Sequence, residues 1–377
     1  MLNDLVCIDD LEKRAYKLLP KSARDYYLSG SDSEETLRRN IYAFKKFLVR
    51  PFCLRNVSSV DLSTSFNLGK ETMTFPCPIG LAPTAFHKLA SGDGEISTVR
   101  AASKANLPMI CSTLGTVSAT DIAKQSFPNT ILWFQLYIFK DREVTKKLIK
   151  KVKAAGFKAL VLTVDTPVFA KRRTEARNNF QLPSHLELAN FKGEESEMEQ
   201  AKTGQSGLQF YSQNYFDASL TWDDLRWLIE YSQMPVIVKG ILRSDDAELA
   251  IKSGASAIYV SNHGGRQMNS AISTIEALAG IVEEVRKSDK HIPIFFDSGV
   301  RTGLDILKAV VLGADLVLVG RPVLYGLTCG GEAGVTHALN ILKSEFEVAM
   351  KLAGVTSIAE ARASKQLLIK EDIVSKI

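Results

Sequence analysis

Residues with reactive side chains follow a short apolar run in the second half of the chain. The segment "SNHGGRQ", residues 261–267, places His263, two glycines and Arg266 directly after "ASAIYV". Histidine is the side chain best suited to take up a proton near neutral pH. An arginine can hold a carboxylate through paired hydrogen bonds. The segment therefore predicts removal of a proton from a small anion.

Two residues from an earlier part of the chain complete this candidate group. Asp165 follows the apolar run "ALVLTV" and could hold the ring of His263 in one tautomer and stabilise its cation. Arg172 could bind the carboxylate together with Arg266. The remaining histidines have no comparable setting and are expected to be structural: His87, His185, His291 and His337.

Two glycine and arginine segments near the C-terminus predict an anion site. In "DSGVRTG" and "GRPVLYG", Gly299 and Gly320 would let backbone N–H groups approach an anion. Arg301 and Arg321 supply charge-assisted contacts. The pair predicts a phosphate clamp and hence a nucleotide cofactor. Because no G-x-G-x-x-G opens a βαβ unit, a Rossmann-bound nicotinamide is poorly supported.

The elements that must position these residues are short apolar runs alternating with amphipathic stretches. Continuous hydrophobicity indicates parallel strands that helices cover on both faces. Stretches such as "REVTKKLIKKVKAAG", beside Asp141, and "SDDAELAIKSG", from Ser244, predict helices ending near Gly156 and Gly254. Eight strands are predicted, at residues 77–82, 107–112, 131–137, 159–164, 235–240, 257–261, 292–297 and 315–320.

Eight β/α units over about 250 residues predict an α/β fold of the TIM (β/α)8 barrel type, since a doubly wound sheet would rarely need eight even repeats. We expect a single domain over residues 1–377, with a helical preface at 1–70 and a long polar insertion at 181–220 that forms a lid or is disordered. Such barrels build their active sites at the carboxyl ends of the strands. Polar residues stand at nearly every predicted strand end.

Composition narrows the partners and the compartment. The chain has 377 residues with 47 basic and 42 acidic side chains, and the scattered basic residues argue against nucleic acid as a partner. Five widely spaced cysteines fit free thiols, and no metal site is predicted. No signal peptide or membrane span is expected. The C-terminal Ser375-Lys376-Ile377 differs from the peroxisomal S-K-L in one aliphatic residue, which predicts a peroxisomal location and otherwise a cytoplasmic one.

Taken together, these motifs resemble the FMN-dependent 2-hydroxy-acid oxidases, the family of glycolate oxidase and long-chain hydroxyacid oxidase. The resemblance is carried, from about Asp9 to the C-terminus, by "SNHGGRQ", "LTVDTP", "FQLYIFKD", "APTAFHK", "VKGIL" and "VRTGLDILKAVVLGA", in the order of the family. It implies FMN as the cofactor and oxidation of an (S)-2-hydroxy acid to the 2-oxo acid, with dioxygen reduced to hydrogen peroxide.

The resemblance also implies roles for residues that contact the substrate. His263 would be the catalytic base with Asp165 as its partner, and Arg172 and Arg266 would bind the substrate carboxylate. Two tyrosines and a lysine join them: Tyr26 at the carboxylate, Tyr137 at the hydroxyl or keto oxygen, and Lys239 at the N1 and O2 edge of the flavin, where a cation stabilises the reduced ring.

A second set of residues would hold the cofactor, if the resemblance is followed along the chain. The ring system would lie against the backbone at Pro83, Thr84 and Ala85 and against Ser112, Gln135, Thr163 and Ser261. Asp297 would meet the ribityl chain. The phosphate would meet Gly299, Arg301, Gly320 and Arg321.

The chain departs from the pattern of the family at three places. Leu114 stands where glycolate oxidases carry tryptophan, so longer or bulkier substrates become plausible. Met268 and Asn269 replace a usual Leu-Asp, and Ser298 replaces a usual glycine. Neither change touches a residue with an implied catalytic role.

Three questions stay open at this point. The electron acceptor could be a cytochrome or quinone rather than dioxygen, although no haem domain precedes the barrel. A catalytically silent flavin-binding paralog is the other alternative, and the complete set of reactive residues argues against it. Relatives of this kind are often tetramers, which predicts a homo-oligomer.

Overall fold

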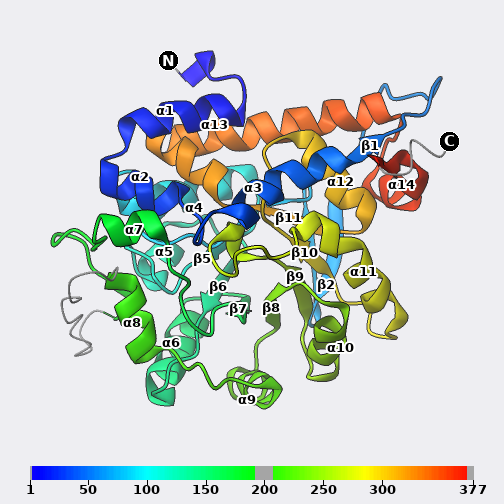
Figure 1. The fold of residues 1–377 in the computed structure, drawn as a ribbon. Coiled ribbons are helices and arrows are strands. Elements are labelled where there is room, and N and C mark those ends of the chain that lie inside the picture. Colours follow the sequence, from blue (N-terminus) through cyan, green and yellow to red (C-terminus); the bar gives the residue numbers. More distant parts are fainter. Residues whose placement is uncertain (1, 192–206, 372–377) are drawn as a thin grey trace.

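The central element of the computed structural model, which describes residues 2–191 and 207–371, is a closed barrel of eight strands (Figure 1). All neighbouring strands run parallel, and β10 closes the barrel against β9. Each strand falls where the sequence predicts one, so the predicted TIM-barrel fold is confirmed. The bounds are β4 Ile79–Leu81, β5 Met109–Cys111, β6 Leu132–Leu136, β7 Ala159–Thr163, β8 Val236–Ile241, β9 Ala257–Val260, β10 Ile294–Phe296 and β11 Leu316–Val319.

Side chains that point into the barrel form their own apolar cluster. It includes Ile110, Trp133, Val161, Tyr259 and Phe295, each at most 1% exposed. The rings of Trp133 and Phe295 stack with their centroids 5.2 Å apart. The alternate residues of the same strands pack outward against the helices. Because both faces of every strand are buried, the strands read as continuous apolar runs.

Helices follow the strands around the outside of the barrel, as expected from the alternating pattern. The predicted helix after β6 is α6, and the side chain of Asp141 caps it by accepting a hydrogen bond from the Glu143 N–H at 2.8 Å. The helix after β8 is α10. The bounds are α4 Glu95–Ala105, α5 Ala119–Gln125, α6 Arg142–Ala154, α9 Trp222–Ser232, α10 Ser244–Lys252, α11 Thr274–Lys287, α12 Gly303–Leu312, α13 Arg321–Ala353 and α14 Ile358–Ala363.

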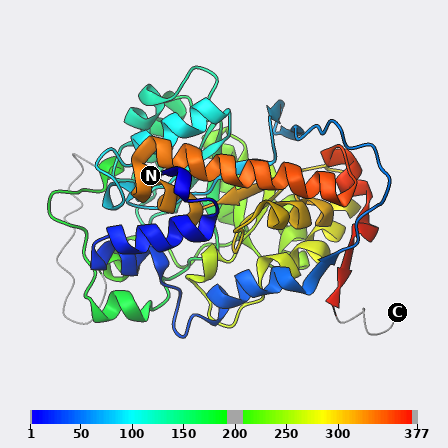
Figure 2. The ribbon, with the colours of Figure 1, turned by 90° about the horizontal axis from the view of Figure 1, so that it is seen from above.

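The first 70 residues are helical only in part. They contain α1 Ile8–Leu18, α2 Lys21–Leu28 and α3 Glu35–Tyr42, and α1 lies alongside α13 (Figure 2). Two strands also fall in this segment. The strand β1, Phe47–Val49, pairs with β12, Leu368–Lys370, and β2 begins at Thr64. A three-residue strand whose partner lies some 300 residues away leaves no periodic signal in the sequence.

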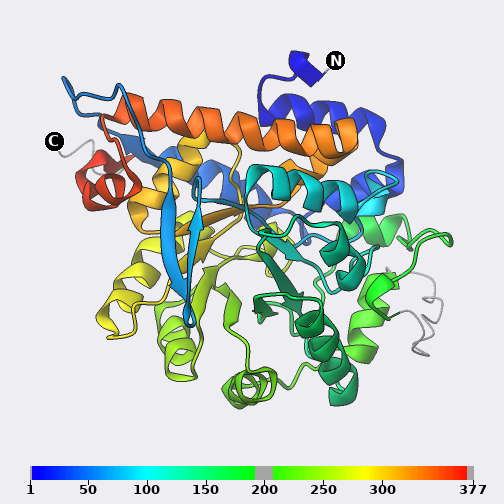
Figure 3. The ribbon, with the colours of Figure 1, turned by 180° about the vertical axis from the view of Figure 1, so that it is seen from behind.

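A hairpin formed by β2, Thr64–Leu68, and β3, Glu71–Phe75, closes one end of the barrel (Figure 3). Phe66 packs on Phe295 with ring centroids 5.2 Å apart, and Phe75 meets Trp133 edge-on at 6.5 Å. The turn at Gly69 lies against Pro235, which immediately precedes β8. The hairpin therefore covers the amino ends of the strands and leaves the carboxyl ends open.

The predicted insertion at 181–220 is only partly within the described residues, since residues 192–206 fall outside them. Its described parts hold a short 3-10 turn, Ala189–Phe191, and α8, Gly207–Tyr215, and the short α7, Arg173–Arg177, precedes it. A bridge between Phe139 and Phe216 joins its end to the loop after β6. Over the described ranges, no helix is both long and apolar enough to cross a bilayer.

Candidate active site

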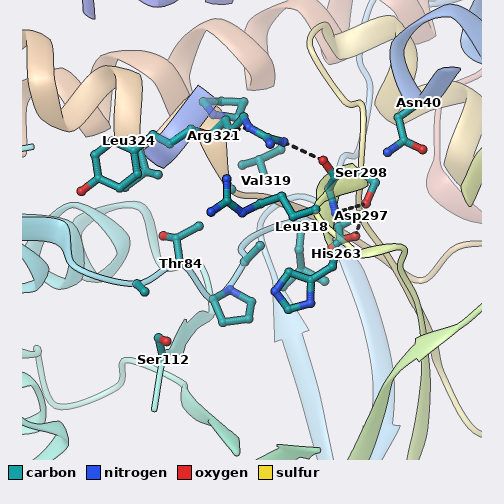
Figure 4. Close-up of a pocket in the computed structure, with 18 of the residues that line it drawn as sticks. Asn40, Thr84, Ser112, His263, Asp297, Ser298, Leu318, Val319, Arg321 and Leu324 are labelled. Atoms are coloured by element: carbon teal, nitrogen blue, oxygen red, sulfur yellow. Dashed lines mark hydrogen bonds between the residues drawn. The ribbon is translucent and has the colours of Figure 1, made fainter. Parts of the chain in front are cut away.

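The carboxyl ends of the barrel strands surround one deep cavity (Figure 4). Its empty volume, with the open mouth included, is about 1170 Å³. The structure brings nearly all of the predicted residues to its wall: Tyr26, Pro83, Thr84, Ala85, Ser112, Leu114, Gln135, Tyr137, Thr163, Arg172, Lys239, His263, Arg266, Asp297, Gly299, Arg301, Gly320 and Arg321. Asp165 and Ser261 are the two predicted residues that do not line it.

Both of these residues lie behind His263 and fix its position. The Nδ1 atom of His263 is 2.8 Å from Oδ1 of Asp165, and the backbone N–H of His263 donates to the Ser261 hydroxyl at 3.1 Å. A carboxylate accepts only, so Nδ1 carries the proton of the neutral ring. The other ring nitrogen, Nε2, is left to act as a base toward the cavity.

The electrostatics of the pair favour a neutral histidine beside an ionised aspartate. Burial lowers the pKa of His263 below its ordinary value of 6.5, and the Asp165 charge opposes this shift without reversing it. The pKa of Asp165 is lowered although burial opposes this, because Lys239 and His263 both favour its charged form. At neutral pH the ring of His263 can therefore accept a proton, and the negative charge of Asp165 stabilises the imidazolium that results.

The backbone around His263 explains the two glycines of "SNHGGRQ". His263, Gly264 and Gly265 all have positive φ, at 59°, 65° and 75°. A Cβ on Gly264 would lie 2.9 Å from Nη1 of Arg321, and one on Gly265 would lie 2.6 Å from the Cα of Leu37. Side chains are thus excluded at both glycines by lack of space as well as by conformation. This tight turn aims the imidazole into the cavity.

Arg172 and Arg266 lie side by side at one edge of the cavity and share a partner that sequence reasoning missed. Glu175, 2% exposed, accepts from Nη1 of Arg172 at 3.2 Å and from Nη2 of Arg266 at 3.0 Å. The two cations are therefore only half neutralised. Glu175 comes three residues after Arg172, on α7, but nothing in that spacing indicates that it also reaches Arg266.

Aromatic and aliphatic side chains form the wall beside the arginines. Tyr26 lies under the guanidinium of Arg266, at 4.8 Å from carbon to ring centroid, and burial raises the pKa of both Tyr26 and Tyr137. Both phenols therefore stay protonated and can donate. Leu114 and Phe169 also line the cavity, and Phe169 was not predicted.

Polar side chains at the carboxyl ends of β6, β7 and β8 line the cavity and could contact a flavin ring. The side chain of Gln135 donates from Nε2 to the Thr163 hydroxyl at 3.1 Å, and its oxygen accepts from the N–H of Thr113 at 3.1 Å. Lys239 is 4% exposed, and its Nζ is 3.7 Å from Oδ2 of Asp165, which is too long for a hydrogen bond. Its ammonium therefore has donors to offer a ligand in the cavity.

The two predicted phosphate arginines differ in how they are held. Nη1 of Arg301 lies 3.3 Å from the Glu12 carboxylate, an ion pair that does not have the geometry of a hydrogen bond. Within the part of the chain that the structure describes, Arg321 donates only to backbone carbonyls, those of Tyr27, Gly264 and Ser29, at 2.9 to 3.1 Å. Burial lowers the pKa of Arg321 to about 10, so it remains a cation. A buried cation bonded to neutral acceptors fits an anionic group such as the FMN phosphate.

Two more residues at the cavity were not predicted from the sequence. The hydroxyl of Ser298 donates to Asp297 at 2.7 Å and accepts from the N–H of Gly264 at 3.1 Å, so this departure from the family pattern does contact a predicted cofactor residue. The hydroxyl of Thr84 lies 2.6 Å from Nε2 of His87, a buried histidine that also contacts Thr98 at 2.9 Å. His87 follows a strand end but was set aside as structural.

Comparisons with known proteins agree with this geometry. The sequence pattern of the family described as FMN-dependent dehydrogenase matches residues 15–368. The human protein named 2-hydroxyacid oxidase 1 is 44% identical over 95% of both chains, and maize glycolate oxidase 1 is 42% identical over 100% of this chain and 99% of its own. The L-lactate oxidase of Nostoc is 43% identical over 94% and 96%. A crystal structure of mandelate oxidase with (S)-4-hydroxymandelic acid superposes with a TM-score of 0.88 at 35% identity, covering 97% of this chain and 99% of that one.

Proposed function

The chain belongs to the FMN-dependent dehydrogenase family and is an FMN enzyme of its 2-hydroxy-acid oxidase type. We propose that it oxidises (S)-2-hydroxy acids to 2-oxo acids and reduces dioxygen to hydrogen peroxide. One observation carries the proposal. His263, hydrogen-bonded to Asp165 behind it, faces a cavity in which two arginines share a single carboxylate. A base beside an incompletely neutralised cationic site suits an acid with a removable proton next to its carboxylate.

The residues of the cavity divide the work on the substrate. Arg172 and Arg266 bind and orient the carboxylate. The Tyr137 phenol, kept protonated by burial, donates to the oxygen at C2. Nε2 of His263 takes up the proton, and the carboxylate of Asp165, 2.8 Å from Nδ1, stabilises the imidazolium that forms. His263 serves as the base whether the electrons leave with a hydride or through a carbanion.

FMN, when bound, accepts the two electrons of the oxidation. Lys239 would hold the edge of the ring that becomes negatively charged, and Gln135 with Thr163 would contact the polar side of the ring. Arg321 and Arg301 would hold the phosphate. In the described part of the chain Arg321 has no carboxylate partner, and Arg301 forms an ion pair with Glu12 alone, without hydrogen-bond geometry at its Nη1. Asp297, fixed by Ser298 and by the Tyr259 hydroxyl at 2.8 Å, would meet the ribityl chain.

The side-chain end of the substrate would lie between Leu114 and Phe169. Leu114 is smaller than an aromatic residue and lines the cavity, which supports medium or long straight-chain substrates. Phe169 lines the same cavity and limits its room. Its ring is backed by Phe216 at 5.8 Å and by Tyr137 at 6.2 Å, so it has little freedom to move.

Three further properties belong to the same proposal. Dioxygen is the acceptor that the names of the related oxidases favour, and a cytochrome or quinone is the alternative. A peroxisomal location would place peroxide production where it can be consumed, but Ser375-Lys376-Ile377 lies outside the described residues. The protein is expected to form a homo-oligomer.

The proposal is tested by reaction stoichiometry. Purified protein loaded with FMN is incubated with straight-chain (S)-2-hydroxy acids of increasing length while oxygen uptake, 2-oxo acid and peroxide are measured. Equal amounts of the three support the oxidase. Product that forms only when an artificial dye is supplied would move the assignment to a dehydrogenase with another acceptor, and the absence of product with any acid would favour the silent paralog.

A further inference from the structure

A buried carboxylate lies against the two arginines that are expected to bind the substrate carboxylate. The same oxygen of Glu175, Oε1, is 3.2 Å from Arg172 and 3.0 Å from Arg266, and the hydroxyl of Ser29 approaches it at 3.3 Å. Glu175 is 2% exposed, so solvent does little to screen its charge. A negative charge in this place must weaken the binding of any anion.

The orientation of the two arginines does not depend on Glu175 alone. Nη1 of Arg266 donates to the backbone carbonyls of Tyr26 at 2.6 Å and of Ser29 at 2.8 Å, and its guanidinium lies over the Tyr26 ring. The guanidinium of Arg172 lies 5.3 Å from the ring centroid of Phe169. Neutral partners therefore contact both side chains, and Glu175 adds a negative charge together with its hydrogen bonds.

The charges on and directly behind this part of the cavity wall can be added up. Arg172 and Arg266 contribute two positive charges and Glu175 one negative charge, which leaves one positive charge. Lys239 and Asp165, 3.7 Å apart, cancel each other. His263 stays neutral, because burial keeps its pKa below 6.5. One substrate carboxylate therefore completes the balance, whereas a second would remain buried and unpaired.

We propose that Glu175 is a specificity-determining residue, which sets the carboxylate site to a single net positive charge and so favours monoanionic 2-hydroxy acids over dianions. The proposal rests on the proposed function only in placing the substrate carboxylate at Arg172 and Arg266. Glu175 acts through these two arginines and does not touch the reacting atoms. Its effect on a ligand should therefore scale with the charge of the ligand.

Oxalate and oxamate are suitable probes because they have nearly the same shape and differ by one negative charge. Each is titrated, without substrate, into FMN-loaded protein, and binding is followed by the change in flavin absorbance. The measured quantity is the ratio of the oxalate Kd to the oxamate Kd. Since oxidation is not required, the readout is independent of whether the proposed reaction occurs.

Three variants form a charge series at the site. E175Q raises the net charge by one, and the ratio should fall about tenfold or more, because an added charge at this distance attracts the dianion more strongly. R172Q lowers the net charge by one, and the ratio should rise. The double variant R172Q/E175Q restores the wild-type charge, and the ratio should return to the wild-type value.

A matched control removes a different carboxylate from a different arginine of the cavity. Glu12 pairs with Arg301 at the phosphate end, so E12Q should leave the ratio unchanged. If E175Q fails to fold, comparison of R172Q with R172Q/E175Q isolates Glu175 in the same way.

Two outcomes overturn the proposal. Equal weakening of both probes in E175Q would mean that Glu175 only orients the arginines. If the flavin of the wild-type protein responded to neither probe, no carboxylate would bind at Arg172 and Arg266, and the proposal would fail even if a 2-hydroxy acid were still oxidised.

Discussion

The two ends of the barrel are built from the same strands and have opposite character. On β6, Trp133 lies in the apolar interior, and Gln135, two residues further on, lines the cavity. On β10 the corresponding residues are Phe295 and Asp297. The amino end is covered by the hairpin of β2 and β3 (Figure 3). The carboxyl end is open and polar. Every second side chain of a strand points into the barrel. Two residues further along the same strand, the inward-pointing side chain has therefore moved from the apolar interior to the polar carboxyl end.

The largest effect is expected from a substitution at the carboxyl end, on the rate of the reaction. H263N removes the base and retains a polar side chain, so the rate of flavin reduction by substrate should fall by about 10²- to 10⁴-fold. Stopped-flow absorbance measures it. The thermal midpoint should stay near that of the wild type, because the His263 side chain is 21% exposed and does not belong to the apolar cluster described for the barrel interior. A variant with wild-type rate would show that another group removes the proton.

The opposite result is expected at the amino end. F66A leaves a void against Phe295 and Phe75, which should lower the free energy of unfolding by about 3 to 5 kcal/mol. Denaturant titration measures this. The protein that remains folded should reduce its flavin at the normal rate. F127A, at an exposed phenylalanine, is the control and should change neither quantity.

A smaller effect concerns the pH dependence of the carboxyl end. The base works when unprotonated, so kcat/KM should fall as the pH drops through the pKa of His263, which burial places below 6.5. The Asp165 charge favours the imidazolium and raises this pKa. D165N should therefore move the acid limb of the profile to lower pH and, since the cation loses its stabiliser, lower the maximal rate by about 10²-fold. An acid limb that moves to higher pH in D165N would contradict the assigned pair.

The smallest expected effect is a change of substrate preference without a change of stability. L114W fills the space between Leu114 and Phe169, so the ratio of kcat/KM for long to short straight-chain acids should fall by about tenfold. A Phe169→Leu variant should shift the ratio in the other direction. Equal activity of L114W on all chain lengths would place the side-chain end of the substrate elsewhere.

The fold and most of the cavity wall could be predicted because both depend on one local regularity. Strands buried on both faces are recognisable as apolar runs, and the first polar residues after each run must lie at the rim of a parallel barrel. This is why Lys239, Gln135 and Asp297 were identified correctly as residues of the cavity wall.

The remaining features depend on contacts between distant segments. Glu175 belongs to a five-residue helix, and only the folded chain brings it to Arg266, 91 positions away. His87 acquires its setting from Thr98 on a neighbouring helix. The strand β1 exists only through its pairing with β12. No periodic pattern or motif spacing records such contacts, so sequence reasoning could not find them.

The central claim is that the polar end of the barrel oxidises a 2-hydroxy acid through a bound flavin, and anaerobic mixing tests it most directly. FMN-loaded protein is mixed, without oxygen, with a straight-chain (S)-2-hydroxy acid, and the visible absorbance of the flavin is followed before and after air is admitted. The account predicts that the absorbance disappears with the acid and returns with air as peroxide is released. Flavin absorbance that no 2-hydroxy acid changes would contradict it.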